Sequence, residues 1–330
     1  MNLPLKTIIT ALGLAFAAPM AQAGCMGQNL FEALPEARKI ELQTRAEAAP
    51  FAEGNLWQAT KGEDRLTIVG TYHLEDDRHY DTLAELDPYW DEALGLLVEA
   101  TKEEERALQR AIVAKPELVF ITKGPTLLQL LPADLWAELS AALSARGVPS
   151  IMAAKYQPWF AALALGFAPC DAAAAKAGGL DALLLLEAEI RDLPAQALEP
   201  YDTLFTLFED LSDEEEIKML KSTLALEEQI EDVATTMAEL YFSGRARLLW
   251  EMTRELSYEH ADMSRQEVDQ EMAQMEEAMM AKRNRAWNAK LEAAAAQGPH
   301  IAAFGALHLS GEDGVLNLLA QRGWAVKRLD

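Results

Sequence analysis

Short apolar runs that end in glycine or a carboxylate are the feature that most restricts the fold of this 330-residue chain. Leu66–Gly70, Leu94–Glu99 and His300–Gly305 are the clearest of them. Continuous apolar runs of this length are typical of strands buried on both faces, as in parallel sheets. Segments with helical periodicity separate them, so their order predicts an α/β fold with a mixed or mostly parallel sheet flanked by helices.

The rest of the chain predicts a regular alternation of strands and helices. Leu56–Thr60 forms a hairpin with Leu66–Gly70, and Thr71–Pro88 is polar and irregular. Two capping boxes, at Ser212 and Ser264, open long helices. The other predicted helices cover residues 27–49, a start at Tyr89–Glu92, Pro132–Arg146, Pro158–Leu165, Leu180–Ile190 and Asp313–Arg322; the other predicted strands are Gly147–Ile151, Ala195–Leu198 and Trp324–Leu329.

No low-complexity linker or change of composition divides the chain. We therefore predict a single domain over residues 24–330, with a helical insertion around residues 200–295 between strands of the main sheet. The insertion contains the two long helices, of which the first ends at Gly244 and the second runs to about Ala295. The second carries a methionine stripe, which indicates core packing rather than a copper or cofactor site.

The first 23 residues have the composition of a secretory signal peptide. Lys6 is their only charge, and the apolar segment from Ile8 to Ala18 is too short to span a bilayer. Ala21-Gln22-Ala23 is a small-x-small cleavage site. We therefore predict cleavage after Ala23 and a secreted or periplasmic protein that begins at Gly24.

The two cysteines, Cys25 and Cys170, are an even number in an exported chain, which predicts one disulfide. The loop it closes is about 145 residues long, for which chain entropy gives on the order of 4–5 kcal/mol. Cys25 also suggests a lipid anchor as an alternative. However, Gln22 occupies the position where a lipobox carries an aliphatic residue, which argues against it. No other segment is long and apolar enough to be transmembrane.

The chain is strongly acidic, with 53 acidic against 29 basic residues and a net charge of −24. Such a surface repels phosphate backbones, so nucleic acid is excluded as a partner class, and docking on anionic lipid is disfavoured. We interpret the charge as a source of solubility outside the cytoplasm.

Two of the five histidines, His73 and His308, share one local context. Each lies three residues after a glycine, Gly70 or Gly305, that ends an apolar strand. Ligands of open α/β sheets sit at the carboxyl ends of strands, and glycine allows both a sharp turn and the close approach of a ligand. If the two strands are neighbours, the two imidazoles can meet, and Glu99 follows a third strand at the same kind of position.

Two imidazoles and a carboxylate are a ligand set for a divalent transition metal, with an open position for water. Water on such an ion becomes a nucleophile near neutral pH. The alternative is that each histidine is a hydrogen-bonded structural residue, because a single Gly-x-x-His is common by chance. The pattern alone leaves both interpretations open.

These segments resemble the paired Gly-x-x-His motifs of the TraB/GumN family, which also includes the Tiki-type proteins. The resemblance covers nearly all of the mature chain. Gly70-Thr71-Tyr72-His73 matches the first motif, and Val98-Glu99 matches the strand-end glutamate that follows it. The segment from Gly305 through His308 to Gly314 is a close match to the second motif and its glycine-rich extension, and it is the most specific signal in the chain.

Two further segments extend the resemblance. Arg283-Asn284, followed by Trp287, looks like the Arg-Asn motif before the last strands. Leu198-Glu199 resembles a later Leu-Glu-Thr element, with Pro200 where threonine is usual, so the role of Glu199 is left open.

The resemblance implies an α/β fold shared with the erythromycin-esterase and ChaN-like proteins, the latter able to bind haem. It also implies the metal-dependent peptidase activity of the Tiki branch, which is attributed to the two motif histidines and a glutamate. For many bacterial members no activity is assigned, so the resemblance implies the fold more firmly than it implies catalytic activity.

Under this hypothesis His73, His308 and Glu99 bind a divalent transition metal, Mn, Co, Zn or Fe, and Glu99 is either a ligand or the general base. Arg283 stabilises an oxyanion or clamps a substrate carboxylate, unless it forms only a surface ion pair, and Asn284 orients either group. We expect an exported metal-dependent hydrolase of the peptidase type, acting on a peptide or small molecule. The alternative is a non-catalytic periplasmic binding or regulatory protein for a peptide, metal or haem.

Other candidates are weaker. Glu75, Asp76, Asp77 and His79 crowd the loop after His73, where they add ligands, bind calcium or form a solvated acidic loop. No Gly-x-Ser-x-Gly elbow and no Gly-x-x-x-x-Gly-Lys loop occurs, which disfavours an α/β-hydrolase serine enzyme and a nucleotide site.

Overall fold

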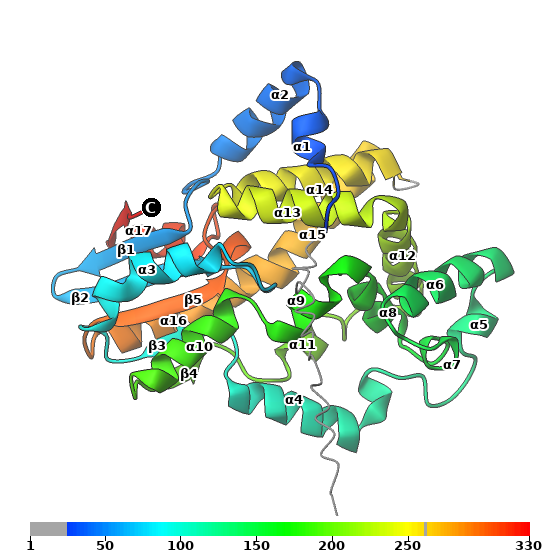
Figure 1. Cartoon of the computed structure of the whole chain (residues 1–330), viewed down its shortest axis with the longest axis horizontal. Coiled ribbons are helices and arrows are strands. Elements are labelled where there is room, and N and C mark those ends of the chain that lie inside the picture. The colour runs from blue at the N-terminus through cyan, green and yellow to red at the C-terminus, as the bar shows by residue number, and fades with distance from the viewer. Residues whose placement is uncertain (1–24, 261–262) are drawn as a thin grey trace, which may run out of the picture.

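A six-stranded sheet in the order β4-β3-β5-β2-β1-β6 forms the centre of the structure, a computed structural model that describes residues 25–260 and 263–330. This sheet with its flanking helices confirms the predicted α/β class (Figure 1). The predicted signal peptide lies outside the described residues. The strands are β1 (Leu56–Lys61), β2 (Asp64–Thr71), β3 (Leu96–Val98), β4 (Ala195–Ala197), β5 (His300–Gly305) and β6 (Ala325–Arg328).

Four neighbouring strands, β4, β3, β5 and β2, are parallel to one another. Strand β1 pairs antiparallel with β2, as the predicted hairpin, and with β6. Residues Gly70 and Thr71 of β2 lie opposite Phe304 and Gly305 of β5, so both strands end at the same level. The carboxyl ends of all four parallel strands therefore lie along one edge of the sheet.

Helices cover both faces of the sheet, as the apolar runs require. Ile68 and Phe304 belong to one core, and their neighbours Val69 and Ala303 belong to the core on the opposite face, because successive side chains of a strand alternate. The first face is covered by α16 (Lys282–Ala295) and α17 (Val315–Gln321), and the second by α3 (His79–Trp90) and α10 (Leu180–Ile190).

A helical region connects β3 to β4 and lies beside the sheet, with α5 to α8 on the right of Figure 1. Leu127, Leu143 and Leu165 are in its own apolar core, which is completed by Leu220 and Leu224 from a later helix. Its elements are α4 (Lys102–Ala114), η1 (Pro116–Leu118), α5 (Leu127–Leu130), α6 (Ala133–Ala145), α7 (Ser150–Ala153), α8 (Pro158–Leu165), η2 (Pro169–Asp171) and α9 (Ala172–Ala177), after which α10 leads to β4.

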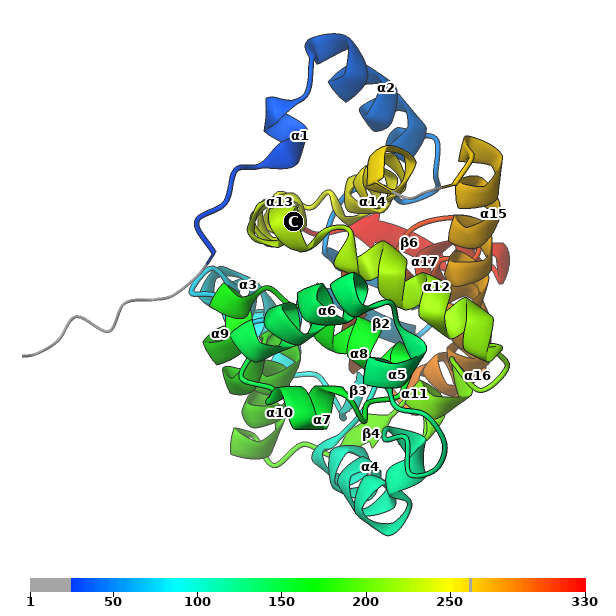
Figure 2. The same ribbon diagram turned by 90° about the vertical axis from the view of Figure 1, so that its right-hand side faces the viewer.

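The predicted insertion occupies the chain between β4 and β5. Helices α13 and α14 pack against the N-terminal helices α1 (Leu30–Ala33) and α2 (Glu36–Glu47), which lie above them in Figures 1 and 2. The elements of the insertion are α11 (Thr203–Thr206), α12 (Asp213–Leu224), η3 (Glu227–Gln229), α13 (Ile230–Phe242), α14 (Ala246–His260), α15 (Arg265–Glu276) and the π-helical turn η4 (Glu277–Ala281), which continues into α16.

Both predicted capping boxes are present, at Ser212 and Ser264. The helix that begins at the first is interrupted, however, because residues 225–229 form a turn between α12 and α13. The predicted helix over residues 27–49 is also divided, since Pro35 has no N–H to continue α1 and instead caps α2.

Three sequence predictions, over two segments of the chain, were wrong. The segment predicted as irregular up to Pro88 contains most of α3, and the helix start predicted at Tyr89–Glu92 is the end of that helix. Only a narrow stripe, with Leu86 and Trp90, faces the core, so the helical period was hidden by polar residues. In place of the predicted strand Gly147–Ile151 the chain forms a turn and then begins α7 at Ser150, and Ile151 is 76% exposed there.

Cys25 and Cys170 form the predicted disulfide, with a Cα–Cα distance of 5.2 Å. It joins the segment before α1 to the turn before α9, next to Ile230 and Ala234 of α13. Within the described part of the chain no single helix meets the length and hydropathy expected of a membrane span, and only the bent pair Pro158–Leu165 and Pro169–Ile190 does so when taken together.

Candidate functional site

Four polar side chains follow the four parallel strands and converge at one edge of the sheet. His73 follows β2, Glu99 follows β3, Glu199 follows β4 and His308 follows β5. Strands β2 and β5 are direct neighbours, which was the condition for the two motif histidines to meet. The sheet order thus places both glutamates on one side of His308 and His73 on the other.

Arg283 lies at the centre of this group and uses all its donors within the protein. Its Nε and Nη2 donate to the two carboxylate oxygens of Glu199 at 2.9 and 2.6 Å, and Nη2 also donates to Glu99 Oε2 at 2.6 Å. Its Nη1 donates to the carbonyl of Met279 at 3.0 Å and to His308 Nε2 at 3.2 Å. A guanidinium has five N–H groups, so this arrangement leaves none for a substrate.

Glu99 is mostly buried beneath this guanidinium, with 18% of its side chain exposed. Its Oε1 accepts a hydrogen bond from the backbone N–H of Gly305 at 2.7 Å. Burial by itself would raise the pKa of Glu99, but His308, Arg283 and His73 outweigh it and lower that pKa to about 2. Glu99 is therefore a carboxylate over the whole physiological pH range.

His308 is buried, and both of its ring nitrogens are engaged. Asn284 Nδ2 donates to the carbonyl of Asp313, so its Oδ1 accepts from the Nδ1–H of His308 at 2.6 Å. The Nε2 of His308 consequently has the lone pair that accepts from Arg283. Burial lowers the pKa of His308 to about 4, so the ring is neutral at pH 7.

His73 differs from the other members because its ring projects into open space, with 62% of the side chain exposed. Its Nδ1 lies 2.7 Å from Asp181 Oδ2, and the other oxygen of Asp181 accepts from Thr71 Oγ1 at 2.7 Å. The negative charge of Asp181, reinforced by Glu99, raises the pKa of His73 to about 9. Its Nε2 has no hydrogen-bond partner in the described structure and faces the group around Arg283.

Two glycines allow these side chains to approach one another. A Cβ on Gly305 would lie 3.3 Å from Glu99 Oε1, 3.5 Å from His73 Nε2 and 3.6 Å from His308 Cδ2, so the backbone there is the point on which the three residues converge. A Cβ on Gly179 would lie 1.9 Å from the carbonyl oxygen of Tyr72. Glycine is therefore required where α10 brings Asp181 against the first motif.

The π-helical turn η4 sets the position of Arg283. It ends two residues before Arg283, and the carbonyl of Met279 within it accepts one of the guanidinium hydrogen bonds. Such turns insert an extra residue into a helix and are frequent at functional sites. On the other side, Trp287 packs against the guanidinium with 4.9 Å between the ring centroid and Cζ, and its Nε1 donates to Glu199.

The three predicted metal ligands do not form a free ligand set in this arrangement. Over the described residues, the only three His, Cys, Asp or Glu ligand atoms that lie within 4.8 Å of one another come from Cys25, Cys170 and Asp171, and two of these are the sulfurs of the disulfide. Both nitrogens of His308 are hydrogen-bonded, and Arg283 already places a positive charge between Glu99 and Glu199. An ion bound by His73, Glu99 and His308 would have to displace that guanidinium, and metal binding stays a prediction.

A cavity of about 270 Å³ extends from this group. His73, Glu99, Arg283 and His308 line one end of it, and most of the remaining wall is apolar. The apolar wall comes from α13, α14, η4 and the loop around Phe167. The site is thus a polar end attached to an apolar chamber, which is the usual composition of a small-molecule pocket.

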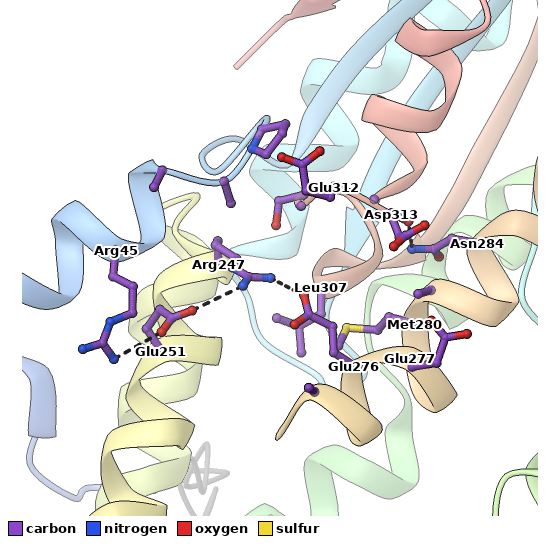
Figure 3. A pocket seen from close by; sticks show the side chains of 18 of the residues that line it. Arg45, Arg247, Glu251, Glu276, Glu277, Met280, Asn284, Leu307, Glu312 and Asp313 are labelled. Atoms are coloured by element: carbon purple, nitrogen blue, oxygen red, sulfur yellow. Dashed lines mark hydrogen bonds and ion pairs between the residues drawn. The ribbon is translucent and has the colours of Figure 1, made fainter. Parts of the chain in front are cut away.

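A second cavity, of about 520 Å³, is lined in part by charged side chains of α2, α14 and α15 and by the loop that follows His308. Figure 3 shows Arg247 between Glu251 and Glu276, with Arg45 on the far side of Glu251. The glycine-rich extension of the second motif, Gly311 to Gly314, forms part of its wall together with Asn284. These ion pairs join α14 to α2 on one side and to α15 on the other.

Two residues of the acidic loop after the first motif form contacts away from the group around Arg283. Asp76 pairs with Arg78, and His79 is fully buried, where its Nε2 donates to the carbonyl of Leu74. His260 contacts Gln229, and His300 lies at the opposite end of β5, as expected for structural residues.

Comparison with known proteins agrees with the motifs. A sequence model of the TraB/PrgY/gumN family matches residues 55–328, which includes every residue of the site. The chain belongs to the TraB/PrgY/gumN family. No curated protein and no solved structure gives a significant match to it.

Two residues of this family member were missed or left open by sequence reasoning. Asp181 was missed, although the pair Gly178-Gly179 before a helix and a carboxylate in its first turn was the available signal. Glu199, whose role was left open because of Pro200, receives two hydrogen bonds from Arg283 and lies in the group. The interpretation of Arg283 as a surface pair does not hold, because only 14% of its side chain is exposed.

Proposed function

We propose that this protein is a hydrolase of the peptidase type, whose catalytic centre is the polar end of the apolar cavity. The observation that carries this proposal is the convergence of His73 and Glu99 beside Gly305 at the polar end of the cavity. The neighbouring charges keep His73 protonated and Glu99 ionised at neutral pH, which are the charge states in which an imidazolium donates a proton and a carboxylate accepts one.

In this proposal His73 is the acid and Glu99 is the base. The imidazolium of His73, oriented by Asp181, first donates a hydrogen bond from Nε2–H to the substrate carbonyl oxygen, where negative charge develops, and then transfers that proton to the leaving nitrogen. Glu99 accepts a proton from the attacking water, because each carboxylate oxygen keeps a lone pair beyond its bond to Gly305 or Arg283. The products are a carboxylic acid and an amine, and the proton on Glu99 returns to His73 through solvent.

Arg283, Asn284 and His308 are positioning residues in this proposal. Arg283 holds Glu99 ionised, His308 accepts a hydrogen bond from Arg283, and Asn284 keeps the proton of His308 on Nδ1. Replacing any of them would misplace Glu99 without removing the acid or the base. This assignment differs from the sequence-based expectation that Arg283 contacts an oxyanion, because all its N–H groups are already bonded.

A metal-dependent route is the second candidate, favoured by the convergence of His73, Glu99 and His308 on Gly305. A manganese, cobalt, zinc or iron ion bound there would supply an activated water. It requires Arg283 to move away from Glu99 and His308. The two routes therefore predict opposite effects of Arg283. In the metal-dependent route its guanidinium competes with the ion, whereas in the acid–base route it keeps Glu99 in place.

The test uses purified residues 24–330, incubated with a peptide library and analysed by mass spectrometry with and without a chelator. We expect cleavage that the chelator does not change. His73→Gln and Glu99→Gln should each lower the rate by about 100-fold or more, the usual contribution of a general acid or base. His260→Gln, a histidine outside the cavity, is the matched control and should cleave normally.

Metal content of the same preparations separates the candidates. The metal-dependent mechanism predicts one ion per chain and cleavage that a chelator abolishes. It also predicts that the ion is lost in His73→Ala/His308→Ala and is retained or increased in Arg283→Ala. These results together would overturn the acid–base mechanism. Absence of cleavage in all conditions, with peptide, metal or haem still bound, would overturn the hydrolase and favour a binding or regulatory protein.

A further inference from the structure

Most of the wall of the catalytic cavity is apolar. Beyond the polar end, its lining is aliphatic, aromatic or methionine, supplied mainly by the helical insertion: Ile230, Val233, Ala234, Met237, Leu249, Trp250, Met279 and Met280. Phe167, 43% exposed, lines it from the loop before the disulfide. The insertion therefore does more than extend the fold, because it builds most of the chamber beside the reacting groups.

One face of α13 is turned toward this space. Ile230, Val233, Ala234, Met237 and Tyr241 recur at intervals of three, one, three and four residues, which places them along a single helical stripe. Such a stripe is normally covered by the core. Here Val233 and Met237 are only half-buried, since they face the cavity instead of another element.

Ionisable groups are few in this part of the wall. Tyr241 donates its hydroxyl to the carbonyl of Gly70, and Tyr72 stacks on Tyr241 at 5.2 Å between ring centroids. Asp171 lies beside the disulfide, and burial raises its pKa. No basic side chain other than Arg283 and the two histidines lines the cavity in the described structure, so a carboxylate entering the apolar part would lose its hydration without compensation.

The volume limits the size of the occupant. A cavity of roughly 150 Å³ lined by apolar side chains holds one benzene ring. The 270 Å³ of this cavity therefore accommodates one large side chain together with part of the adjoining backbone at the polar end. Methionines at three positions of the wall make it adaptable in shape, since their side chains are flexible and polarizable.

We propose that the substrate is a peptide with a large uncharged apolar residue, such as leucine, methionine or phenylalanine, beside the bond that is cleaved, and that α13, α14 and η4 form the pocket for that side chain. This proposal rests on the proposed hydrolase function. It assigns specificity to the insertion and catalysis to the strand ends. The pocket selects for apolar area and against charge, and it discriminates weakly between branched and unbranched side chains.

The experiment compares a set of acetylated amino-acid aminomethylcoumarin amides that differ in one side chain: Gly, Ala, Leu, Met, Phe, Asp and Lys. We expect kcat/KM for Leu, Met and Phe to exceed that for Gly by at least about 10-fold, and Asp to be cleaved most slowly. Uniform kcat/KM over the set would overturn the specificity proposal while leaving the hydrolase intact.

Two methionines provide a matched pair of variants. Met279 lines the cavity and is 38% exposed, whereas Met275, one turn earlier along the chain, is 39% exposed and is not part of that wall. Met279→Gln keeps the length of the side chain but makes it polar, and it should lower the Leu-to-Gly ratio of kcat/KM by about 4-fold, the value of one buried methylene. Met275→Gln should leave the ratio unchanged, and an equal fall in both variants would contradict the proposal.

A binding measurement distinguishes failure of the pocket from failure of the hydrolase. The uncharged dye N-phenyl-1-naphthylamine should fluoresce on binding to the wild-type protein and be displaced by acetyl-leucinamide but not by acetyl-glycinamide. Displacement without any cleavage would refute the hydrolase and support the apolar pocket. If the double variant Met237→Gln/Met279→Gln binds the dye as well as the wild type does, the proposed apolar pocket is refuted.

Discussion

Replacing Arg283 by methionine tests the central contact of the site. The change removes the only guanidinium between Glu99 and Glu199 in the described structure, and it retains most of the apolar volume that packs on Trp287. Two mostly buried carboxylates would then face each other without a cation. Breaking a buried pair in this way is costly because an uncompensated charge remains.

The magnitude follows from the cost of removing one partner of a buried ion pair, about 3–5 kcal/mol. Arg283 is also one of the groups that lower the pKa of Glu99 to about 2 in the folded protein, from 4.5 ordinarily. Because the folded pKa is depressed, the stabilisation is present above pH 4.5 and is lost as the pH falls toward 2. We expect Arg283→Met to lower the free energy of unfolding by about 3 kcal/mol at pH 7. At pH 4 we expect a smaller difference in the free energy of unfolding between the variant and the wild type.

The assay is urea denaturation followed by tryptophan fluorescence at pH 7 and pH 4, with Arg285→Met as the control. Arg285 is two residues away on the same helix, is 43% exposed and pairs with Glu277 and Asp313 at the surface. Surface pairs contribute at most about 1 kcal/mol. Two results would contradict this prediction. One is an equal loss of unfolding free energy in both variants at pH 7, and the other is a loss from Arg283→Met that is the same at both pH values.

Three further outcomes follow from other contacts. Asp181→Asn should lower the pKa of His73 from about 9 toward its ordinary value of 6.5, as measured by NMR titration, and an unchanged value would show that the carboxylate does not charge the ring. Cys25→Ala/Cys170→Ala should lose up to about 4–5 kcal/mol of unfolding free energy, and reductant should reduce the stability of wild type but not of this variant. Glu251→Ala, which removes a 2%-exposed carboxylate from among three arginines, should cost about 3–5 kcal/mol in the same denaturation assay, and a loss below 1 kcal/mol would mean that water already screens the cluster.

The regular elements near the site could be predicted because their local patterns were strong. His300–Gly305 and Leu180–Ile190 have the bounds that the sequence predicted, since an apolar run and a helical period are legible in single segments. The segment 71–90 was misjudged because only a few of its residues face the core. The break between α12 and α13 was missed because the apolar spacing continues across it.

The sequence by itself determined which residue types stand at the strand ends. The two Gly-x-x-His motifs and the carboxylate of Glu99 are local features, and a glycine followed by a polar residue after an apolar strand is sufficient to place them at the sheet edge. The parallel order of the strands then implied that they would be near one another.

Only the tertiary structure decided how these residues are connected. The contact of Asp181 with His73 joins positions 108 residues apart, and the contacts of Arg283 with Glu99 and Glu199 join positions 184 and 84 apart. No local pattern encodes such pairings, because they depend on how α10 and α16 pack on opposite faces of the sheet. That packing also decides the charge of each histidine, since an imidazole beside a carboxylate is protonated at neutral pH and one buried beside a guanidinium is not.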